Sequence, residues 1–134
     1  MMQKQNISGS SPFEPIIGFS RAVRVGNAVH LSGTGPVDAD DADVEAQTRR
    51  IFAIAAEALA KAGASFEDVV RTRMYLTHVE DWEAVGRVHG EVFGSIRPVS
   101  TVMQVPRFID HDWLVEIEMD AVIPEAESGG ATTK

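Results

Sequence analysis

The chain of 134 residues is long enough for one domain with a hydrophobic core and too short for two ordinary domains. Its content of 44% hydrophobic and 24% charged residues is typical of a soluble globular protein and argues against a disordered or membrane-spanning one. The formal net charge of −8 argues against a nucleic-acid partner, because proteins that bind the phosphate backbone of nucleic acids usually carry a basic face or stripe.

The chain contains no cysteine, which excludes thiol catalysis, zinc thiolates and disulfide bonds and is consistent with a reducing compartment. The N-terminal sequence MMQKQNISGSSPFEP lacks the hydrophobic segment of a signal peptide, and no stretch reaches transmembrane length. We therefore expect a cytoplasmic protein without a membrane partner.

Both ends of the chain are polar and contain glycine, as mobile termini do. The sequence predicts a flexible N-terminal arm over residues 1–14, a single domain over residues 15–124 and a flexible tail over residues 125–134.

The first predicted element of the domain is a β-hairpin in RAVRVGNAVHLSG, where apolar residues alternate on both sides of a tight Gly26-Asn27 turn. Residues 43–63 then predict a long helix, because apolar residues recur at helical spacing, alanine is abundant and Gly63 stands where a C-terminal cap belongs. The sequence SFED, residues 65–68, matches a capping box for one short turn.

Residues 69–77 predict a strand with one apolar face and one face that carries Arg71, Arg73 and Tyr75. A second helix is expected over residues 81–94, with Asp81 as N-cap. The residues expected to be buried by this helix are Trp82, Val85, Val88 and Val92.

Two more strands complete the fold, over residues 99–105 and 113–123. In the last strand the apolar residues alternate strictly with Glu116, Glu118 and Asp120. The order of elements predicts an α+β fold in which two helices cover one face of a single sheet. The residues expected on the other face are Arg71, Arg73, Ser100, Gln104, Glu116 and Glu118. That face is either solvated or packed against another subunit.

Three local patterns in the sequence contain residue types that occur in chemical sites. The four histidines (His30, His78, His89 and His111) show no metal-ligand spacing, so we expect neither a metal nor another cofactor. The glycine-rich SGTGP, residues 32–36, indicates a strand terminator or a loop whose backbone lines a pocket. A catalytic serine at Ser100, paired with His89 or His111, is not favoured, because no glycine-flanked elbow surrounds it.

Four blocks in order carry a more specific signal. They are RAVRVGNAVHLSGTGPVD, AGASFEDVVRTRMYLTHVEDWEAVGRVHGEVFG, RPVSTVMQVPRFID and VEIEMDAV, and together they span residues 21–122. This combination resembles the Rid (YjgF-like, reactive intermediate deaminase) family. The resemblance implies a chorismate-mutase-like α+β subunit in a homotrimer with a central β-barrel, with three sites in the clefts between subunits. It therefore favours burial of the second sheet face.

The resemblance also implies site residues. In members that hydrolyse 2-imino acids, a glutamate of the last strand positions the attacking water, and Glu116 occupies its position here. Phe19 stands where active members commonly have tyrosine, and Gly33 matches the pocket glycine. The strand residues implied to line the site are Ser100, Val102 and Gln104.

Ser100 departs from the family pattern, because it stands where an arginine clamps the substrate carboxylate, and Gly86 replaces a common asparagine. An arginine–carboxylate pair makes two charge-assisted hydrogen bonds, so its loss costs roughly 3–6 kcal/mol, or roughly two to four decades in rate or affinity. We expect poor activity on 2-imino acids unless Arg73, Arg97 or Arg107 replaces the clamp.

Three functions compete at this point. The first is hydrolysis of a small imine or enamine metabolite, with a deaminase-like reaction at Glu116. The second is a trimeric small-ligand-binding protein without catalysis. The third, a ribonuclease-like or translation-inhibiting role reported for some relatives, is the least favoured because the chain is acidic.

Overall fold

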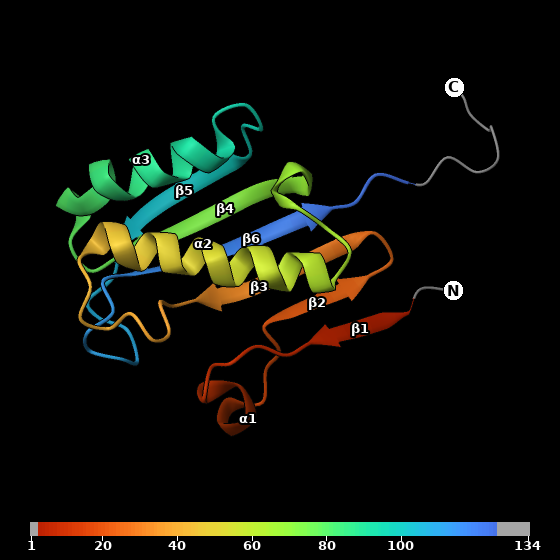
Figure 1. Ribbon diagram of the computed structural model, residues 1–134, viewed down its shortest axis with the longest axis horizontal. Coiled ribbons are helices and arrows are strands. Elements are labelled where there is room, and N and C mark those ends of the chain that lie inside the picture. The colour runs from red at the N-terminus through yellow and green to blue at the C-terminus, as the bar shows by residue number, and fades with distance from the viewer. Residues whose placement is uncertain (1–2, 126–134) are drawn as a thin grey trace.

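The computed structural model describes residues 3–125 and shows an α+β fold built on one mixed, six-stranded sheet. The elements are β1 (Lys4–Ile7), α1 (Phe13–Ile17), β2 (Ala22–Val25), β3 (Ala28–Thr34), α2 (Val44–Lys61), β4 (Val69–Leu76), α3 (Trp82–Phe93), β5 (Val99–Gln104) and β6 (Val115–Val122), with short 3-10 turns at Phe66–Asp68 and Val79–Asp81. The strand order is β1-β2-β3-β6-β4-β5, and α2 and α3 cover one face of the sheet (Figure 1). Within residues 3–125, no helix has the length and apolar character needed to cross a membrane.

The expected succession of strands and helices from residue 22 onward is confirmed. The N-terminal segment differs from the prediction of a flexible arm, because Lys4–Ile7 pair antiparallel with β2 and α1 begins at Phe13. A buried ion pair between Glu14 Oε2 and Arg21 Nε, at 3.3 Å, ties this segment to the domain. The predicted tail, apart from Glu125, lies outside the described residues.

Helix α2 begins and ends as its sequence predicts. The Asp43 side chain accepts a hydrogen bond from the amide of Ala46, and Gly63 follows the helix with φ of +85°. Ile51, Ala55 and similarly spaced residues of α2 are buried in the core under the sheet.

Helix α3 departs from the prediction at its first turn. Trp82 is 58% exposed instead of buried, and the Asp81 side chain makes no capping hydrogen bond. The Trp82 ring lies near Gly86, and a Cβ on residue 86 would stand 3.9 Å from it, at ordinary van der Waals distance. Val85 and Val88 are buried as expected.

Strand β4 carries a bulge that changes which valine enters the core. The pairing of β4 with β6 shifts register between Val69 and Arg71. Val69 is therefore buried and Val70 is exposed, whereas Thr72 and the apolar residues after it lie in the core as predicted.

Strand β5 faces the opposite way from the prediction. It pairs in parallel with β4, so that Ser100 lies beside Thr72 and Gln104 beside Leu76. Thr72 and Leu76 are fully buried on the helix side of the sheet, and Ser100 and Gln104 therefore lie on that side as well. The open face of β5 instead carries Val99, Thr101 and Met103.

The open face of the sheet is crossed by a row of paired charges. Arg73 Nη1 lies 3.1 Å from Glu118 Oε1 and 3.4 Å from Asp120 Oδ2. His30 Nδ1 lies 2.8 Å from the other oxygen of Asp120. Three neighbouring strands, β3, β6 and β4, are thereby linked on this face.

Candidate functional site

A cavity of about 100 Å³ lies between α1, the end of β3 and the start of β6. Among the residues that line it are Phe13, Phe19, Gly33, Ile109, Trp113 and Glu116. It thus brings together three of the residues that the sequence marks for the site: an aromatic ring, a glycine and a carboxylate. The other walls are apolar for the most part.

Gly33 lets the Glu116 carboxylate enter this cavity. The register between β3 and β6 shifts between Leu31 and Thr34, which brings Gly33 against the side chain of Glu116. A Cβ on residue 33 would stand 2.8 Å from Glu116 Oε1, closer than real Cβ contacts allow. A side chain at residue 33 would therefore force the carboxylate to move.

The Glu116 carboxyl is electrostatically unusual. Burial raises its pKa above the ordinary range of glutamate, while the charge of Arg21 opposes this rise and that of Glu118 adds to it. No group within residues 3–125 donates a hydrogen bond to this carboxylate. Its oxygens are free to accept a proton or a hydrogen bond from a bound molecule.

Arg21 is the buried cation beside the cavity. Its Nη1 donates hydrogen bonds to the carbonyl oxygen of Gly33 at 2.8 Å and to Thr34 Oγ1 at 3.1 Å. Its Nε is paired with Glu14, and its guanidinium carbon lies 5.3 Å from the centre of the Phe19 ring. These contacts occupy Nη1 and Nε, so Arg21 supports the cavity wall, while its Nη2 has no hydrogen-bond partner within residues 3–125.

The N-terminal segment supplies a wall that the sequence did not predict. The Phe13 ring packs edge-to-face on Trp113, with centroids 6.1 Å apart. A Cβ on residue 35 would overlap the Trp113 ring, so Gly35 allows the tryptophan to reach this position. The sequence feature that could have indicated this wall is the glycine pair of SGTGP. Gly33 permits close approach of the Glu116 side chain, and Gly35 permits close approach of the Trp113 ring.

Ser100, Val102 and Gln104 do not line this cavity. Glu116 alternates with core residues of β6 and points away from the helices, whereas Ser100 lies on the helix side of β5. Strand β4 separates the two strands. Within one subunit, the two sets of expected site residues therefore lie on opposite faces of the sheet.

A hydrogen-bonded chain connects Ser100 to a histidine. Thr72 Oγ1 lies 2.7 Å from Ser100 Oγ and 2.9 Å from His89 Nε2. The imidazole packs against the rings of Phe93 and Phe52, and its burial lowers its pKa. This link between Ser100 and His89 was not anticipated, because it depends on the intervening threonine of another strand.

The other residues expected near a site have separate roles. Gln104 Oε1 accepts a hydrogen bond from the amide of Val79. Arg73 is paired with carboxylates of β6, and the Arg107 guanidinium donates to the carbonyls of Phe108 and Ile109. Neither of these arginines lines the cavity.

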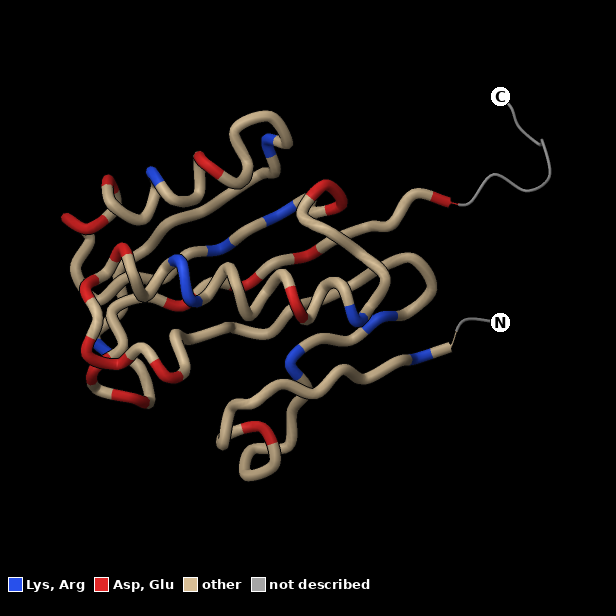
Figure 2. The backbone as a smooth tube through the Cα atoms, viewed as in Figure 1, with Lys and Arg blue, Asp and Glu red and all other residues tan. Residues whose placement is uncertain are grey.

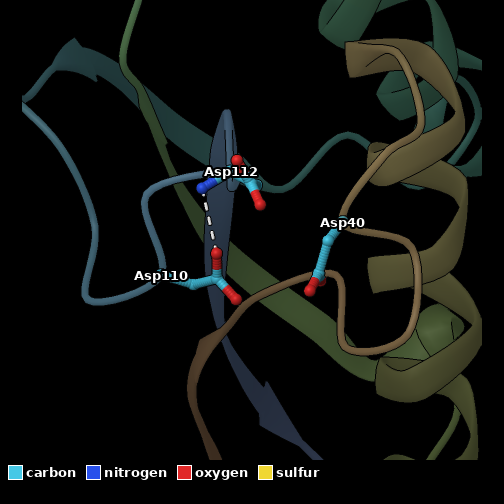
Figure 3. Close-up of side chains that lie close together, drawn as sticks. All are labelled: Asp40, Asp110 and Asp112. Carbon is cyan, nitrogen blue, oxygen red and sulfur yellow. Dashed lines mark hydrogen bonds between the residues drawn. The ribbon is translucent and has the colours of Figure 1, made fainter.

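Three carboxylates, Asp40, Asp110 and Asp112, lie close together at the end of the molecule where acidic residues gather (Figures 2 and 3). Asp40 Oδ1 accepts a hydrogen bond from the indole nitrogen of Trp113 at 3.1 Å, and Asp110 Oδ1 accepts one from the amide of Asp112 at 2.9 Å. These bonds tie the loop before α2 to the loop before β6 and hold Trp113 in the cavity wall.

Comparisons with known proteins agree with this architecture. The family model described as Endoribonuclease L-PSP matches residues 9–123. An uncharacterised protein of Streptomyces coelicolor is 41% identical over 121 residues, which cover 87% of this chain and 90% of the relative. A RutC family protein of Pyrococcus abyssi is 32% identical over 122 residues, covering 87% of this chain and 95% of the relative.

A solved structure supports the same assignment. Rv2704 of Mycobacterium tuberculosis, described as a member of the highly conserved YjgF/YER057c/UK114 family, superposes with a TM-score of 0.85 at 43% identity. The match covers 90% of this chain and all of the other. The chain therefore belongs to the Endoribonuclease L-PSP family, which is also called the YjgF, Rid or RutC family.

Proposed function

We propose that this protein hydrolyses the C=N bond of a small imine or enamine-derived metabolite, in clefts between the subunits of a homotrimer with a central β-barrel. The observation that carries the proposal is the Glu116 carboxyl, which lies in a cavity with Phe19 and Gly33 and has a raised pKa without a hydrogen-bonding partner among the described residues. The family resemblance marks Glu116 for positioning the attacking water and Phe19 and Gly33 as residues that complete the pocket.

The chemistry follows from the state of this carboxyl. Glu116 accepts a proton from water as the water oxygen attacks the imine carbon, and the C=N double bond becomes a single bond. The proton then passes to the nitrogen, which gives a carbinolamine. Glu116 next takes the hydroxyl proton of the carbinolamine and returns it to the nitrogen, so that the C–N bond breaks, ammonia leaves and the carbon becomes a carbonyl. A carboxyl whose pKa is raised toward the working pH is suited to both transfers.

The separation of Glu116 and Ser100 supports an assembled site. Both belong to one site in the family pattern, yet they project from opposite faces of the sheet in one subunit. A single site that contains both thus requires two copies of the chain. The edge strand β5 also exposes Val99, Val102 and Met103, an apolar edge that a neighbouring subunit would cover.

Assembly has its own test. Light scattering should give a mass of three times 14.5 kDa at micromolar concentration. Replacement Met103→Glu on the exposed edge should weaken this assembly, whereas Ala56→Glu on the exposed surface of α2 should not. A monomeric wild-type protein would contradict the assembled cleft.

The substrate we propose has no carboxylate that requires a clamp. Ser100 stands at the position of the family arginine, Nη1 and Nε of Arg21 are bonded to Gly33, Thr34 and Glu14, and Arg73 is paired with β6. Hydrolysis of 2-iminopropanoate should therefore be little faster than in buffer.

Two other functions have less support. A non-catalytic trimeric protein that binds a small ligand would use the same cavity. The assay must therefore distinguish ligand binding alone from hydrolysis. The ribonuclease activity named in the family description requires contact with phosphates, and the net charge of −8 opposes it.

Substitution Glu116→Gln tests the proposal, with Glu118→Gln on the same strand as a matched control. Benzaldimine, made in situ by a flavin amine oxidase from benzylamine, supplies an imine without a carboxylate. We expect Glu116→Gln to slow its hydrolysis about a hundredfold and Glu118→Gln to leave the rate nearly unchanged. Equal rates for wild type and Glu116→Gln in an intact trimer would favour the binding protein.

A further inference from the structure

A chain of hydrogen bonds leads from the half-buried His89 to the exposed Ser100. Thr72, which is fully buried between them, bonds to Ser100 Oγ at 2.7 Å and to His89 Nε2 at 2.9 Å. The water-activating role of Glu116 uses neither Thr72 nor His89. The chain ends at the position where the family pattern has its carboxylate-binding arginine.

The protons in this chain can be arranged in two ways, because each hydroxyl has one proton and can also accept. If His89 Nε2 carries a proton, it donates to Thr72, Thr72 donates to Ser100, and the Ser100 proton is free for a ligand acceptor. If Nε2 is unprotonated, Ser100 donates to Thr72, Thr72 donates to His89, and the Ser100 oxygen is free to accept from a ligand donor.

The surroundings keep this end of the site uncharged. The His89 ring lies 4.7 Å from the Phe93 ring and 6.3 Å from the Phe52 ring, between centroids, and its burial lowers its pKa. The imidazole is therefore neutral near neutral pH, and both proton arrangements exist without a buried charge. No charged side chain within residues 3–125 bonds to this chain of groups.

We propose that Ser100 binds an uncharged polar group of the ligand, such as a carboxamide or hydroxyl, and that Thr72 and His89 are positioning residues that hold Ser100 as donor or acceptor. The inference rests on the proposed function only in placing Ser100 in the cleft. A carboxylate would lose hydration there and receive one neutral hydrogen bond in return, whereas a carboxamide can use either arrangement. The site thus selects the amide over the acid of the same shape.

Binding of two product-like probes, 2-oxopropanamide and 2-oxopropanoate, tests this preference without requiring catalysis. We expect NMR titration of the assembled protein to show tighter binding of the amide. Ser100→Ala should weaken amide binding about threefold to tenfold, and Thr101→Ala, on the opposite face of β5, should not change it. Thr72→Val should also weaken amide binding and should shift the ¹⁵N resonance of His89 Nε2, because it removes the hydroxyl that contacts this nitrogen.

The outcomes separate this inference from the proposed hydrolysis. Amide binding that depends on Ser100 in a protein without hydrolytic activity would support the inference and overturn the hydrolase. The inference is overturned if Ser100→Ala and Thr101→Ala bind the amide equally well, if the carboxylate probe binds more tightly, or if neither probe binds. In those cases Ser100 and His89 only satisfy the hydrogen-bonding capacity of the buried Thr72 hydroxyl.

Discussion

Gly33 and Glu116 are so close that a Cβ on residue 33 would stand 2.8 Å from a carboxylate oxygen. The two residues come from β3 and β6, which meet at a register shift between Leu31 and Thr34. The carboxylate reaches the cavity because residue 33 has no side chain. This contact is the structural basis for the position of the proposed catalytic group.

Substitution Gly33→Ala should therefore displace the carboxylate while the fold survives. We expect imine hydrolysis to fall about a hundredfold, the scale of a misplacement of about 1 Å at a reacting group. Gly90→Ala is the control, because a Cβ on residue 90 would have no neighbouring atom within 4 Å. Residue 90 also lies inside α3, where alanine is more favourable than glycine. This variant should retain activity and raise stability by about 0.5–1 kcal/mol. Full activity of Gly33→Ala would show that the close contact has no role.

The raised pKa of Glu116 predicts a pH dependence of stability. The folded carboxyl binds its proton more tightly than the unfolded one, so the free energy of unfolding falls as the pH rises from the ordinary glutamate pKa through the raised pKa. Below both pKa values the carboxyl is protonated in the folded and the unfolded state, so this loss of stability is absent. Substitution Glu116→Gln should thus raise the melting temperature relative to wild type at about pH 7, and the difference should disappear toward about pH 4.

The matched substitution Glu118→Gln should behave in the opposite way at neutral pH. It removes the partner of Arg73 on the open face and should lower the melting temperature slightly. If Glu116→Gln also lowered the melting temperature at neutral pH, the Glu116 charge would stabilise the fold. Its role would then be structural, and the proposal that the fold holds this charged carboxylate at a cost in stability would be wrong.

The buried pair of Glu14 and Arg21 predicts a coupled effect on stability and on the site. Glu14→Gln leaves Arg21 buried without its counter-charge, which should cost about 3 kcal/mol or more in urea unfolding. The uncompensated charge of Arg21 should also lower the pKa of Glu116 and shift the acid limb of the hydrolysis profile to lower pH. Glu45→Gln breaks an exposed pair with Arg49, which water and salt screen, and should change the stability far less than Glu14→Gln does. Equal losses in the two variants would contradict this account of Arg21.

The fold was largely predictable because its main elements carry local signals. The strict alternation of Val115 to Asp120 and the apolar spacing of α2 specify a strand and a helix without distant contacts. The faces of β5 were not predictable in this way, because alternation separates two faces but does not say which one meets the helices. That choice depends on the parallel register of Ser100 with Thr72.

The N-terminal segment and part of the site also depend on distant contacts. Nothing in the sequence near Glu14 indicates Arg21 as its buried partner, and so residues 1–14 have only the polar, glycine-containing signal of a flexible arm. Phe19, Gly33 and Glu116 could be marked from the family resemblance, and the cavity brings them together. The link from Ser100 to His89 was missed because Thr72, which completes it, lies on another strand.

The central claim is that Glu116 of one copy and Ser100 of another complete a single site, and subunit complementation measures this most directly. Glu116→Gln and Ser100→Trp, which fills the other side of the cleft, should each be inactive as uniform trimers. In a trimer that contains both variants, one of three clefts combines an intact Glu116 with an intact Ser100. Mixed trimers isolated by two different tags should therefore recover about one third of the wild-type rate on benzaldimine. Mixed trimers that form but remain as inactive as either parent would contradict the shared site.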